Sequence, residues 1–486
     1  MLLKFSFVLA LWGAVVTAQS AGTFTTTGNM TTARAAHTAT LLPNGKVLIA
    51  GGAQYVTVGS TLVLASAELY DPITSKFTAT GNMTTPRQQH TAALLADGRV
   101  LIEGGSQEHP GQTVDLASAE IYDPSTETFT ATGDLSTAQH WLGATLLGDG
   151  KILVAGGISG PFPTTAPAQL YDPGTGMFGA TGAYTTAVSR ADSGNWPAKA
   201  TLLPDGRVLV LGLPIAAELY DPGAGMFSAT GIAAPNDDDA LSPIQQSATL
   251  LLDGNVLVTR GVDGLTGTSG VYDPSTETTT VTGTMTTARQ FYTDTLLPDG
   301  AVLIAGHPYL SSAELYDPAT GTFSATGNMT VPRVFHTATL LPDGTVLVAG
   351  GTDSHPSTST TSSAELYKPV LLTPAAALLS LSGDGRGQGA ILHAGTARVA
   401  SSSDPASVGE ALEIYCTGLA DGSVIPPQVA IGGRMAEVLY FGNAPGFVGL
   451  NQVNVVVPSG VVAGPTVPLR LTYIGRPSNE VTMSVR

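Results

Sequence analysis

Cysteine and charged residues are scarce in this chain, and each shortage excludes something. The only cysteine among 486 residues is Cys416, so no internal disulfide can form and packing must stabilise the fold. A lone cysteine of this kind is interpreted as a small buried apolar residue rather than a reactive thiol. Charged residues make up 12% of the chain, and the net charge is −17. Because phosphate binding needs clustered Lys and Arg, we expect no nucleic-acid partner.

Long apolar runs are missing as well. The stretch from Phe5 to Val16 is too short to span a bilayer, and small residues follow it. This is the pattern of a secretory signal peptide, residues 1–18, cleaved near Ala18. No later run reaches the roughly 18 apolar residues of a membrane helix. We therefore expect no transmembrane segment and a protein that is secreted or held in the cell envelope.

Glycine, in contrast, is abundant, with 58 residues, and seven glycines mark an internal repeat. The motif LLPNG, which ends at Gly45, has six further copies, and a relative of AELYDP follows each of the seven. A spacing of about 50 residues predicts a repeat architecture. The tyrosines of the second motif are Tyr70, Tyr122, Tyr171, Tyr220, Tyr272, Tyr316 and Tyr367.

Each repeat contains four predicted strands. HTATLL alternates in polarity and ends at Asn-Gly or Asp-Gly, which favours a two-residue hairpin turn with positive φ angles. KVLIAGG is continuously apolar, as in a strand buried on both faces. SAELYDP and TGTFSATG supply the third and fourth strands. Four antiparallel strands per repeat predict a β-propeller blade.

The ends of the repeat region predict how the ring closes. Each fourth strand has an aromatic residue near its start, except for Thr279, and none follows the seventh AELY. Phe24 lies before the first repeat, so the N-terminal strand completes the last blade and leaves no exposed edge. The prediction is a seven-bladed propeller over residues 22–369.

The repeat is lost after Pro369. We interpret residues 370–396, which include GDGRGQG, as a linker, and the short apolar strands of residues 397–486 as a small β-sandwich. The fold class is therefore all-β, a seven-bladed propeller followed by a sandwich. GEALEIYCTGLADG and NQVNVVVPSG resemble an immunoglobulin-like module of secreted bacterial proteins.

The seven repeats resemble kelch repeats of the kind found in the propeller of galactose oxidase and its relatives. That resemblance implies a copper-radical site made by a Cys crosslinked to a Tyr, a second Tyr and two His. Cys416 lies in the other module, so the sequence argues against this chemistry, and we expect no cofactor and no metal site. Sialidase boxes, HExxH zinc motifs and GxSxG elbows are also missing.

Arg and His recur at fixed positions before the first strand of several repeats. We interpret them as scaffold residues that tie blades together by hydrogen bonds. They are Arg34, Arg87, Arg289, Arg333, His37, His90 and His336.

A site in a near-symmetric ring is expected where the repeat is broken. Blades three to five depart from the pattern in consecutive loops, which places aromatic, acidic and amide groups at one mouth. The candidate ligand-binding residues are Gln139, His140, Trp141, Arg190, Asp192, Asn195, Trp196, Asp237, Asp238, Asp239 and Gln245. The Asp triplet is interpreted as a solvated loop rather than a Ca²⁺ site.

These observations favour a secreted, non-catalytic, monomeric recognition protein whose partner is an extracellular glycan or protein. The alternative is an extracellular carbohydrate-active enzyme that uses the loop carboxylates of blades three to five. A purely structural surface protein is a third possibility.

Overall fold

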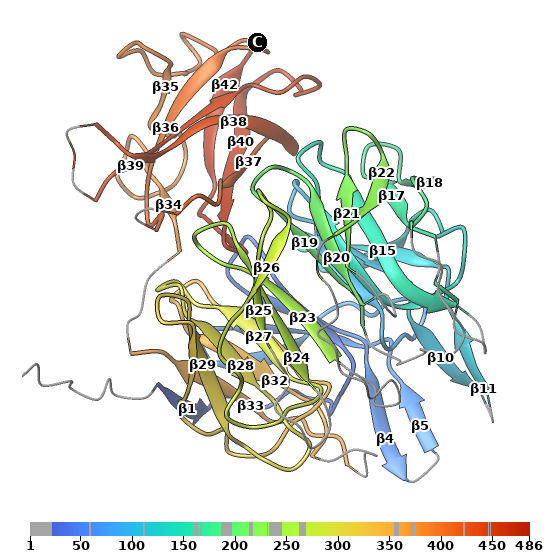
Figure 1. Ribbon diagram of the computed structural model, residues 1–486. Helices are drawn as coiled ribbons and strands as arrows, with labels where there is room; N and C mark the ends of the chain where they lie inside the picture. Colours follow the sequence, from blue (N-terminus) through green and yellow to red (C-terminus); the bar gives the residue numbers. More distant parts are fainter. Residues whose placement is uncertain are drawn as a thin grey trace, which may run out of the picture.

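The computed structural model shows an all-β protein with seven antiparallel sheets arranged in a ring, six of four strands and one of five, followed by a C-terminal β-unit (Figure 1). This confirms the predicted fold class. The structure describes residues 22–486 except 58–59, 110–111, 160–163, 166, 186–196, 213–216, 231, 233–244, 262–268, 354–358, 371–374, 421–422, 446 and 448.

Each blade is one sheet whose strands follow the order of the chain from the channel outward. Blade one is β2 (Thr38–Leu41), β3 (Val47–Ala50), β6 (Ala67–Asp71) and β7 (Lys76–Ala79). Blade two is β8 (Thr91–Leu94), β9 (Val100–Glu103), β12 (Ala119–Asp123) and β13 (Thr128–Ala131). Blade three is β14 (His140–Leu146), β15 (Ile152–Ser159), β17 (Gln169–Asp172) and β18 (Met177–Ala180), with β16 (Thr164–Thr165) beside β15. Blade four is β19 (Lys199–Leu202), β20 (Val208–Leu211), β21 (Glu218–Asp221) and β22 (Met226–Ala229).

The remaining blades repeat this order. Blade five is β23 (Gln245–Leu250), β24 (Val256–Gly261), β25 (Gly270–Asp273) and β26 (Thr278–Val281). Blade six is β27 (Thr293–Leu296), β28 (Val302–Ala305), β29 (Ala313–Asp317) and β30 (Thr322–Ala325). Blade seven is β31 (Thr337–Leu340), β32 (Val346–Ala349), β33 (Ala364–Lys368) and the N-terminal β1 (Thr23–Thr26).

The hydrophobic core lies between the blades. The second strands are buried on both faces, as their apolar runs predict: Val47 and Leu48, which point to opposite faces, are both buried. Neighbouring sheets pack face to face, so Leu48 of blade one and Ile102 of blade two belong to one cluster. Conserving this packing around the ring requires the same apolar pattern in every repeat, which explains the internal sequence similarity.

Tyrosine and threonine side chains add a polar tie between blades. The hydroxyl of Tyr70 in blade one lies 2.8 Å from that of Thr27, which follows the outer strand of blade seven. The same Tyr–Thr contact joins five more pairs of blades. These six tyrosine hydroxyls thereby have partners, which offsets the penalty for burying them, whereas the hydroxyl of Tyr272 in blade five has none among the described residues.

The turn between the first and second strands differs from the prediction. Gly45 has φ +82°, but Asn44 before it does not adopt positive φ. Leu42 N–H donates to Lys46 O, and Gly45 N–H donates to Leu42 O. The hairpin therefore has a three-residue loop that ends in a left-handed glycine, and not a two-residue turn.

The ring closes as predicted. β1 pairs antiparallel with β33, with Phe24 opposite Tyr367. Strands from the two ends of the repeat region thus share one sheet, so the last blade has its fourth strand.

Two faces of the propeller are distinguished below. The loop face carries the connections from the second to the third strand and from each fourth strand to the next blade. There β4 (Ala53–Thr57) and β5 (Ser60–Val63) form one ribbon, and β10 (Ser106–His109) and β11 (Gln112–Asp115) form another. The turn face carries the hairpins between first and second strands.

The C-terminal unit is a β-sandwich whose two sheets share a long strand, β38. Its strands are β34 (Ala377–Leu378), β35 (Ile391–His393), β36 (Ala411–Thr417), β37 (Gln428–Ile431), β38 (Arg434–Asn443), β39 (Asn451–Val456), β40 (Gly464–Tyr473), β41 (Arg476–Pro477) and β42 (Val481–Val485). Cys416 is buried in this core as a free thiol. Residues 370–396, which the sequence suggested as a linker, contain β34 and β35. Both strands pair with β36 of the sandwich.

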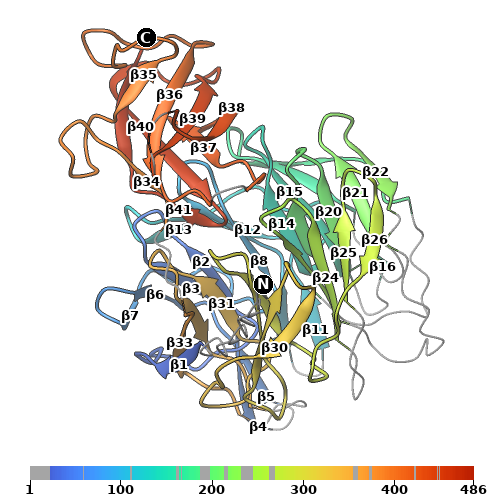
Figure 2. The same cartoon turned by 60° about the vertical axis from the view of Figure 1, so that its left-hand side comes forward.

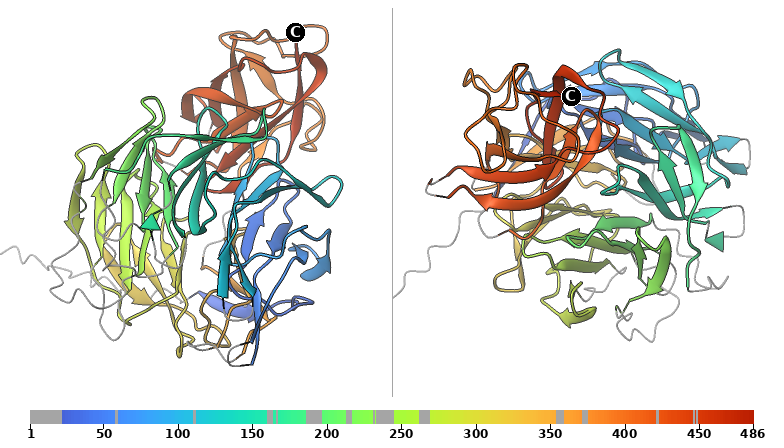
Figure 3. Two further views of the ribbon diagram at one scale, coloured as in Figure 1. Left: turned by 90° about the vertical axis from the view of Figure 1, so that its right-hand side faces the viewer. Right: turned by 90° about the horizontal axis from the view of Figure 1, so that it is seen from above.

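The sandwich packs on the turn face of the propeller (Figures 2 and 3). The Arg470 guanidinium donates to Asp97 O at 2.9 Å, and Val424 N–H donates to Leu252 O at 3.0 Å. Both acceptors lie in hairpins of the propeller. The loop face is therefore left uncovered by the sandwich.

Candidate functional site

The recurring arginines are buried inside the blades. In blade one, Arg34 Nη1 donates to Gly51 O at 2.7 Å, and Nη2 donates to Glu68 Oε1 at 2.8 Å. Glu68 also accepts from Thr31 N–H. Blades two, six and seven contain the same Arg–Glu pair. These side chains are fully enclosed by scaffold contacts, and their guanidinium groups are not presented to a ligand.

The recurring histidines join neighbouring blades. His37 Nε2 lies 3.0 Å from Thr337 Oγ1 of blade seven, and His90 Nε2 lies 2.9 Å from Thr38 Oγ1 of blade one. Burial lowers the pKa of His90 to about 3, and nearby Arg87 acts in the same direction. The imidazole is therefore neutral and serves as a hydrogen-bonding strut.

Blade three is the first place where this scaffold changes. Gln139 replaces the arginine and Gln169 replaces the glutamate, and both are buried. Gln169 Oε1 accepts from Ser136 N–H at 2.8 Å, which is the contact that the glutamate makes elsewhere. Two neutral amides thus stand where other blades have an ion pair, and Gln139 Oε1 and Gln169 Nε2 have no hydrogen-bond partner among the described residues.

His140 and Asp115 form a hydrogen-bonded pair on the loop face. His140 begins β14, and Asp115 ends the β10–β11 ribbon of blade two. His140 Nδ1 lies 2.8 Å from Asp115 Oδ1, with side-chain exposures of 12% and 10%. A carboxylate can only accept, so Nδ1 carries the proton and Nε2 is left as the acceptor. Nε2 makes no hydrogen bond to the residues that the structure describes.

Aromatic rings lie at the same level of the repeat. Trp141 contacts His140 at 5.1 Å between ring centroids, and it has φ +59°. The equivalent positions Phe291 and Phe335 have φ +55°, and their rings contact each other at 4.4 Å between centroids with a tilt of 52°. The backbone N–H of Trp141 donates to Gln89 O, one of a series of hydrogen bonds between these positions in successive blades. Aromatic residues thus occupy this position in blades three, six and seven.

A buried carboxyl group lies at the end of the second strand of blade two. Glu103 ends β9 where most blades have alanine or another apolar residue, and it is fully buried. Neither carboxyl oxygen has a hydrogen-bond partner, and Gly105, two residues on, donates to Gln139 O. Burial raises the pKa of Glu103 well above its ordinary value, although Arg87 opposes this shift. Burial therefore favours the protonated form of this carboxyl group, which does not reach the surface.

Of the remaining candidates, Gln245 begins β23, the first strand of blade five. Seven other candidates lie outside the described residues: Arg190, Asp192, Asn195, Trp196, Asp237, Asp238 and Asp239.

Asp115, Glu103, Phe291 and Phe335 were not predicted. Glu103 could have been found by aligning VLIEGG with VLIAGG, and the two phenylalanines by aligning the position that precedes the recurring histidine.

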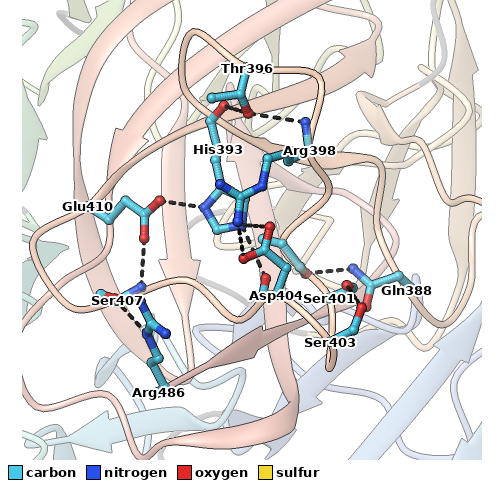
Figure 4. A network of polar contacts seen from close by, with 11 residues as sticks. Gln388, His393, Thr396, Arg398, Ser401, Ser403, Asp404, Ser407, Glu410 and Arg486 are labelled. Carbon is cyan, nitrogen blue, oxygen red and sulfur yellow. Dashed lines mark hydrogen bonds and ion pairs between the residues drawn. The ribbon is translucent and has the colours of Figure 1, made fainter.

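A second polar network lies within the sandwich (Figure 4). His393 Nδ1 bonds Glu410, while Nε2 lies 3.1 Å from Asp404 O and 3.4 Å from Asp404 Oδ2. Arg398 pairs with Asp404, and Glu410 accepts from Ser407 N–H. These contacts tie the segment after β35 to the start of β36. The network therefore holds these two segments together within the sandwich.

The comparisons with known proteins find similarity among solved structures. Scans against protein-family models and curated protein sequences find no similar protein. Among solved structures, the chain is similar to a fungal alcohol oxidase of the AA5 family in complex with copper, with a TM-score of 0.59 and 18% identity. The likeness covers 96% of this chain and 100% of the other. It confirms the resemblance to the galactose oxidase propeller.

The comparison corrects the functional expectation. The sequence favoured a non-catalytic recognition protein and a non-enzyme, with copper-radical oxidation set aside. A protein similar in architecture along its whole length is an oxidase, so the finding points away from a purely binding role. At 18% identity, the likeness establishes the fold, and the residues of this chain must decide the chemistry.

Copper does not fit the residues that the structure describes. Cys416 is buried in β36 of the sandwich, away from the propeller loops. Within the described ranges, no three His, Cys, Asp or Glu side chains are grouped to hold a metal ion. His37, His90 and His336 bond threonine hydroxyls instead. We derive no step through copper. No helix of the described part is long and apolar enough to span a membrane.

Proposed function

We propose that this protein is an exported carbohydrate-active enzyme whose active site lies on the loop face at blades three to five. The observation that carries the proposal is the contact of 2.8 Å between His140 Nδ1 and Asp115 Oδ1. It orients an imidazole whose Nε2 is unpaired within the described part of the chain. Such a pair is suited to accept a proton from water or from a substrate hydroxyl. Cleavage of the signal peptide near Ala18 would deliver the enzyme outside the cytoplasm.

The aromatic ring beside His140 supports carbohydrate as the substrate. The indole of Trp141 is suited to stack on the apolar face of a sugar. The loops of blades four and five would supply the polar contacts, through Arg190, Asp192, Asn195, Trp196 and the Asp237–Asp239 triplet.

The reaction proposed is glycoside hydrolysis. His140 Nε2 takes a proton from water, and the water oxygen attacks the anomeric carbon. The bond between that carbon and the leaving oxygen breaks, and a carboxyl group of Asp237, Asp238 or Asp239 protonates the leaving oxygen. General acid and base groups on opposite sides of the sugar are what hydrolysis with inversion requires.

Release of reducing ends from a panel of soluble polysaccharides by the full-length chain tests the proposal. We expect turnover that His140→Gln lowers by roughly 10²- to 10⁴-fold, because general base catalysis is worth about that much. Asp115→Asn should lower kcat more than it changes KM, since it misorients the imidazole. His307→Gln, on the same face in blade six, is the matched control and should retain full activity. Absence of turnover in the unaltered protein, or equal turnover in His140→Gln, would show that the proposal is wrong.

A further inference from the structure

The inner strands of blades four to six carry a second break in the repeat, on the opposite side of the molecule from the proposed active site. Most first strands read Thr-Ala-Thr-Leu or a close relative. Blade four has Lys199 at the first of these positions, and blade six has Asp294 in place of the alanine. These substitutions introduce a positive and a negative side chain among small neutral ones.

The two charges meet across blade five. Lys199 Nζ lies 3.1 Å from Asp294 Oδ1, although the residues are separated by a whole blade. Ser247 and Thr249, both on the first strand of blade five, donate hydroxyl hydrogen bonds to the two oxygens of Asp294. Burial opposes ionisation of Asp294, but Lys199 and both hydroxyls lower its pKa below the ordinary value. Asp294 is therefore an ionised carboxylate with three donors, and it is only 4% exposed.

This cluster borders a cavity of about 970 Å³ between the propeller and the sandwich. Leu202, Leu250 and Leu296 line it on the propeller side. Ile425, Val457 and Ile474 line it on the sandwich side. The volume falls within the range of small-molecule pockets, which are mostly apolar with a few placed polar groups. The cavity needs both units of the chain.

The charges decide which ligand suits it. Asp294 already has three donors, so it offers little to a cationic ligand. An anion would meet Asp294 and Glu437, which also lines the cavity, in a chain of net charge −17. Lys199, whose side chain is 42% exposed, has three ammonium protons and can donate to a further acceptor in the cavity.

We propose that the cavity between propeller and sandwich binds an uncharged, mostly apolar molecule through one hydroxyl or carbonyl oxygen, which accepts a hydrogen bond from Lys199. Burial of the apolar body against the leucine and isoleucine walls supplies most of the affinity. The lysine supplies orientation and the preference for an oxygen-bearing molecule. This site is independent of the proposed hydrolysis on the loop face.

Displacement of the neutral fluorophore N-phenyl-1-naphthylamine from the full-length protein tests the proposal. The competitors are decan-1-ol, decane, decanoate and decylamine. We expect saturable binding of the fluorophore, and displacement by decan-1-ol at roughly tenfold lower concentration than by decane, since hydrogen bonds to charged donors are the stronger kind. Equal potency of decan-1-ol and decane, stronger displacement by either charged competitor, or no saturable binding would overturn it.

Two variants locate the interaction. Lys199→Met should bring decan-1-ol to the potency of decane, while Lys76→Met, on the outer strand of blade one, should change nothing. Because Lys199→Met leaves Asp294 buried without a cation, the double variant Lys199→Met with Asp294→Asn provides a neutral version of the same cluster. If that double variant keeps the preference for the alcohol, Lys199 is not the donor and the proposal fails. Should either variant not fold, the competitor series on the unaltered protein still decides.

Discussion

Phe24 and Tyr367 are separated by nearly the whole propeller in sequence, yet their rings lie 4.9 Å apart at an interplanar angle of 53°. They belong to β1 and β33, which pair in one sheet. Equivalent contacts inside other blades, such as Tyr70 with Phe77, join strands that are adjacent in the chain. The Phe24–Tyr367 contact is therefore a closure contact of the ring.

Replacement of Phe24 by alanine should loosen this closure. We expect a loss of about 2 kcal/mol, below the full cost of a core Phe because Phe24 is only partly buried. Hydrogen exchange of intact protein should show faster exchange in both β1 and β33. Phe77→Ala is the matched control, and its effect should stay within blade one. If both variants loosen the same strands, closure does not depend on Phe24.

The Arg34–Glu68 pair should behave as a unit. Arg34→Gln alone leaves Glu68 buried without a cation and should cost about 3–5 kcal/mol. Adding Glu68→Gln gives blade one the two neutral amides that blade three has in Gln139 and Gln169, and should restore more than half of that loss. Thermal denaturation of the two variants measures the difference. A double variant no more stable than the single one would contradict this account.

Glu103→Gln should stabilise the protein at neutral pH. The pKa of Glu103 is raised in the folded state, so folding keeps a proton that the unfolded chain releases above the ordinary value of 4.5. Stability is therefore lost as pH rises above 4.5, and an uncharged amide avoids this loss. We expect a higher Tm for Glu103→Gln at pH 7, by roughly 2–4 °C for each kcal/mol gained. The difference should vanish near pH 4, and a gain that is equal at both pH values would have another cause.

The contact of His393 with Glu410 should give the sandwich a pH-dependent stability (Figure 4). Burial alone lowers the pKa of His393, but Glu410 and Asp404 outweigh it and raise the pKa above 6.5. The stabilisation from His393 is thus complete below pH 6.5 and is lost as pH rises through the raised pKa. Burial likewise opposes ionisation of Glu410, yet His393 and Ser407 lower its pKa, so its contribution is lost as pH falls through that value.

Glu410→Gln tests this pair. It should lower the pKa of His393, as followed by proton NMR of its imidazole, and should cost about 1 kcal/mol between the two titrations because solvent screens the contact. Glu413→Gln, on β36 just after Glu410, is a control that should leave the pKa of His393 nearly unchanged. An unaltered titration in Glu410→Gln would show that Glu410 does not set the pKa.

Much of the fold could be predicted because it depends on periodic patterns. Apolar runs such as Val47–Ala50 predicted the doubly buried strands, and the motif around Tyr70 predicted a third strand in every repeat. The position of Phe24 before the first repeat predicted the closure. The hairpin type was wrong because Asn-Gly is compatible with two turns, and only the backbone hydrogen bonds of Leu42 distinguish them.

The candidate site was less predictable. The broken repeat did point to His140, but its partner Asp115 comes from another blade, 25 residues away. The expectation of a binding protein without catalysis rested on missing motifs, and a fold-level likeness to an oxidase contradicts it. Missing motifs are weak evidence in a propeller, because a site there is assembled from single residues of several loops.

The sequence by itself determined the strands, their number and the ring. The alternating or continuous apolar residues that become buried form a local pattern, and this pattern recurs in every repeat. Only the tertiary structure decided which side chains meet. Lys199 reaches Asp294 across a whole blade, and Asp115 reaches His140 from a ribbon of the preceding one. Such contacts depend on how the blades are placed around the ring, which no local pattern encodes.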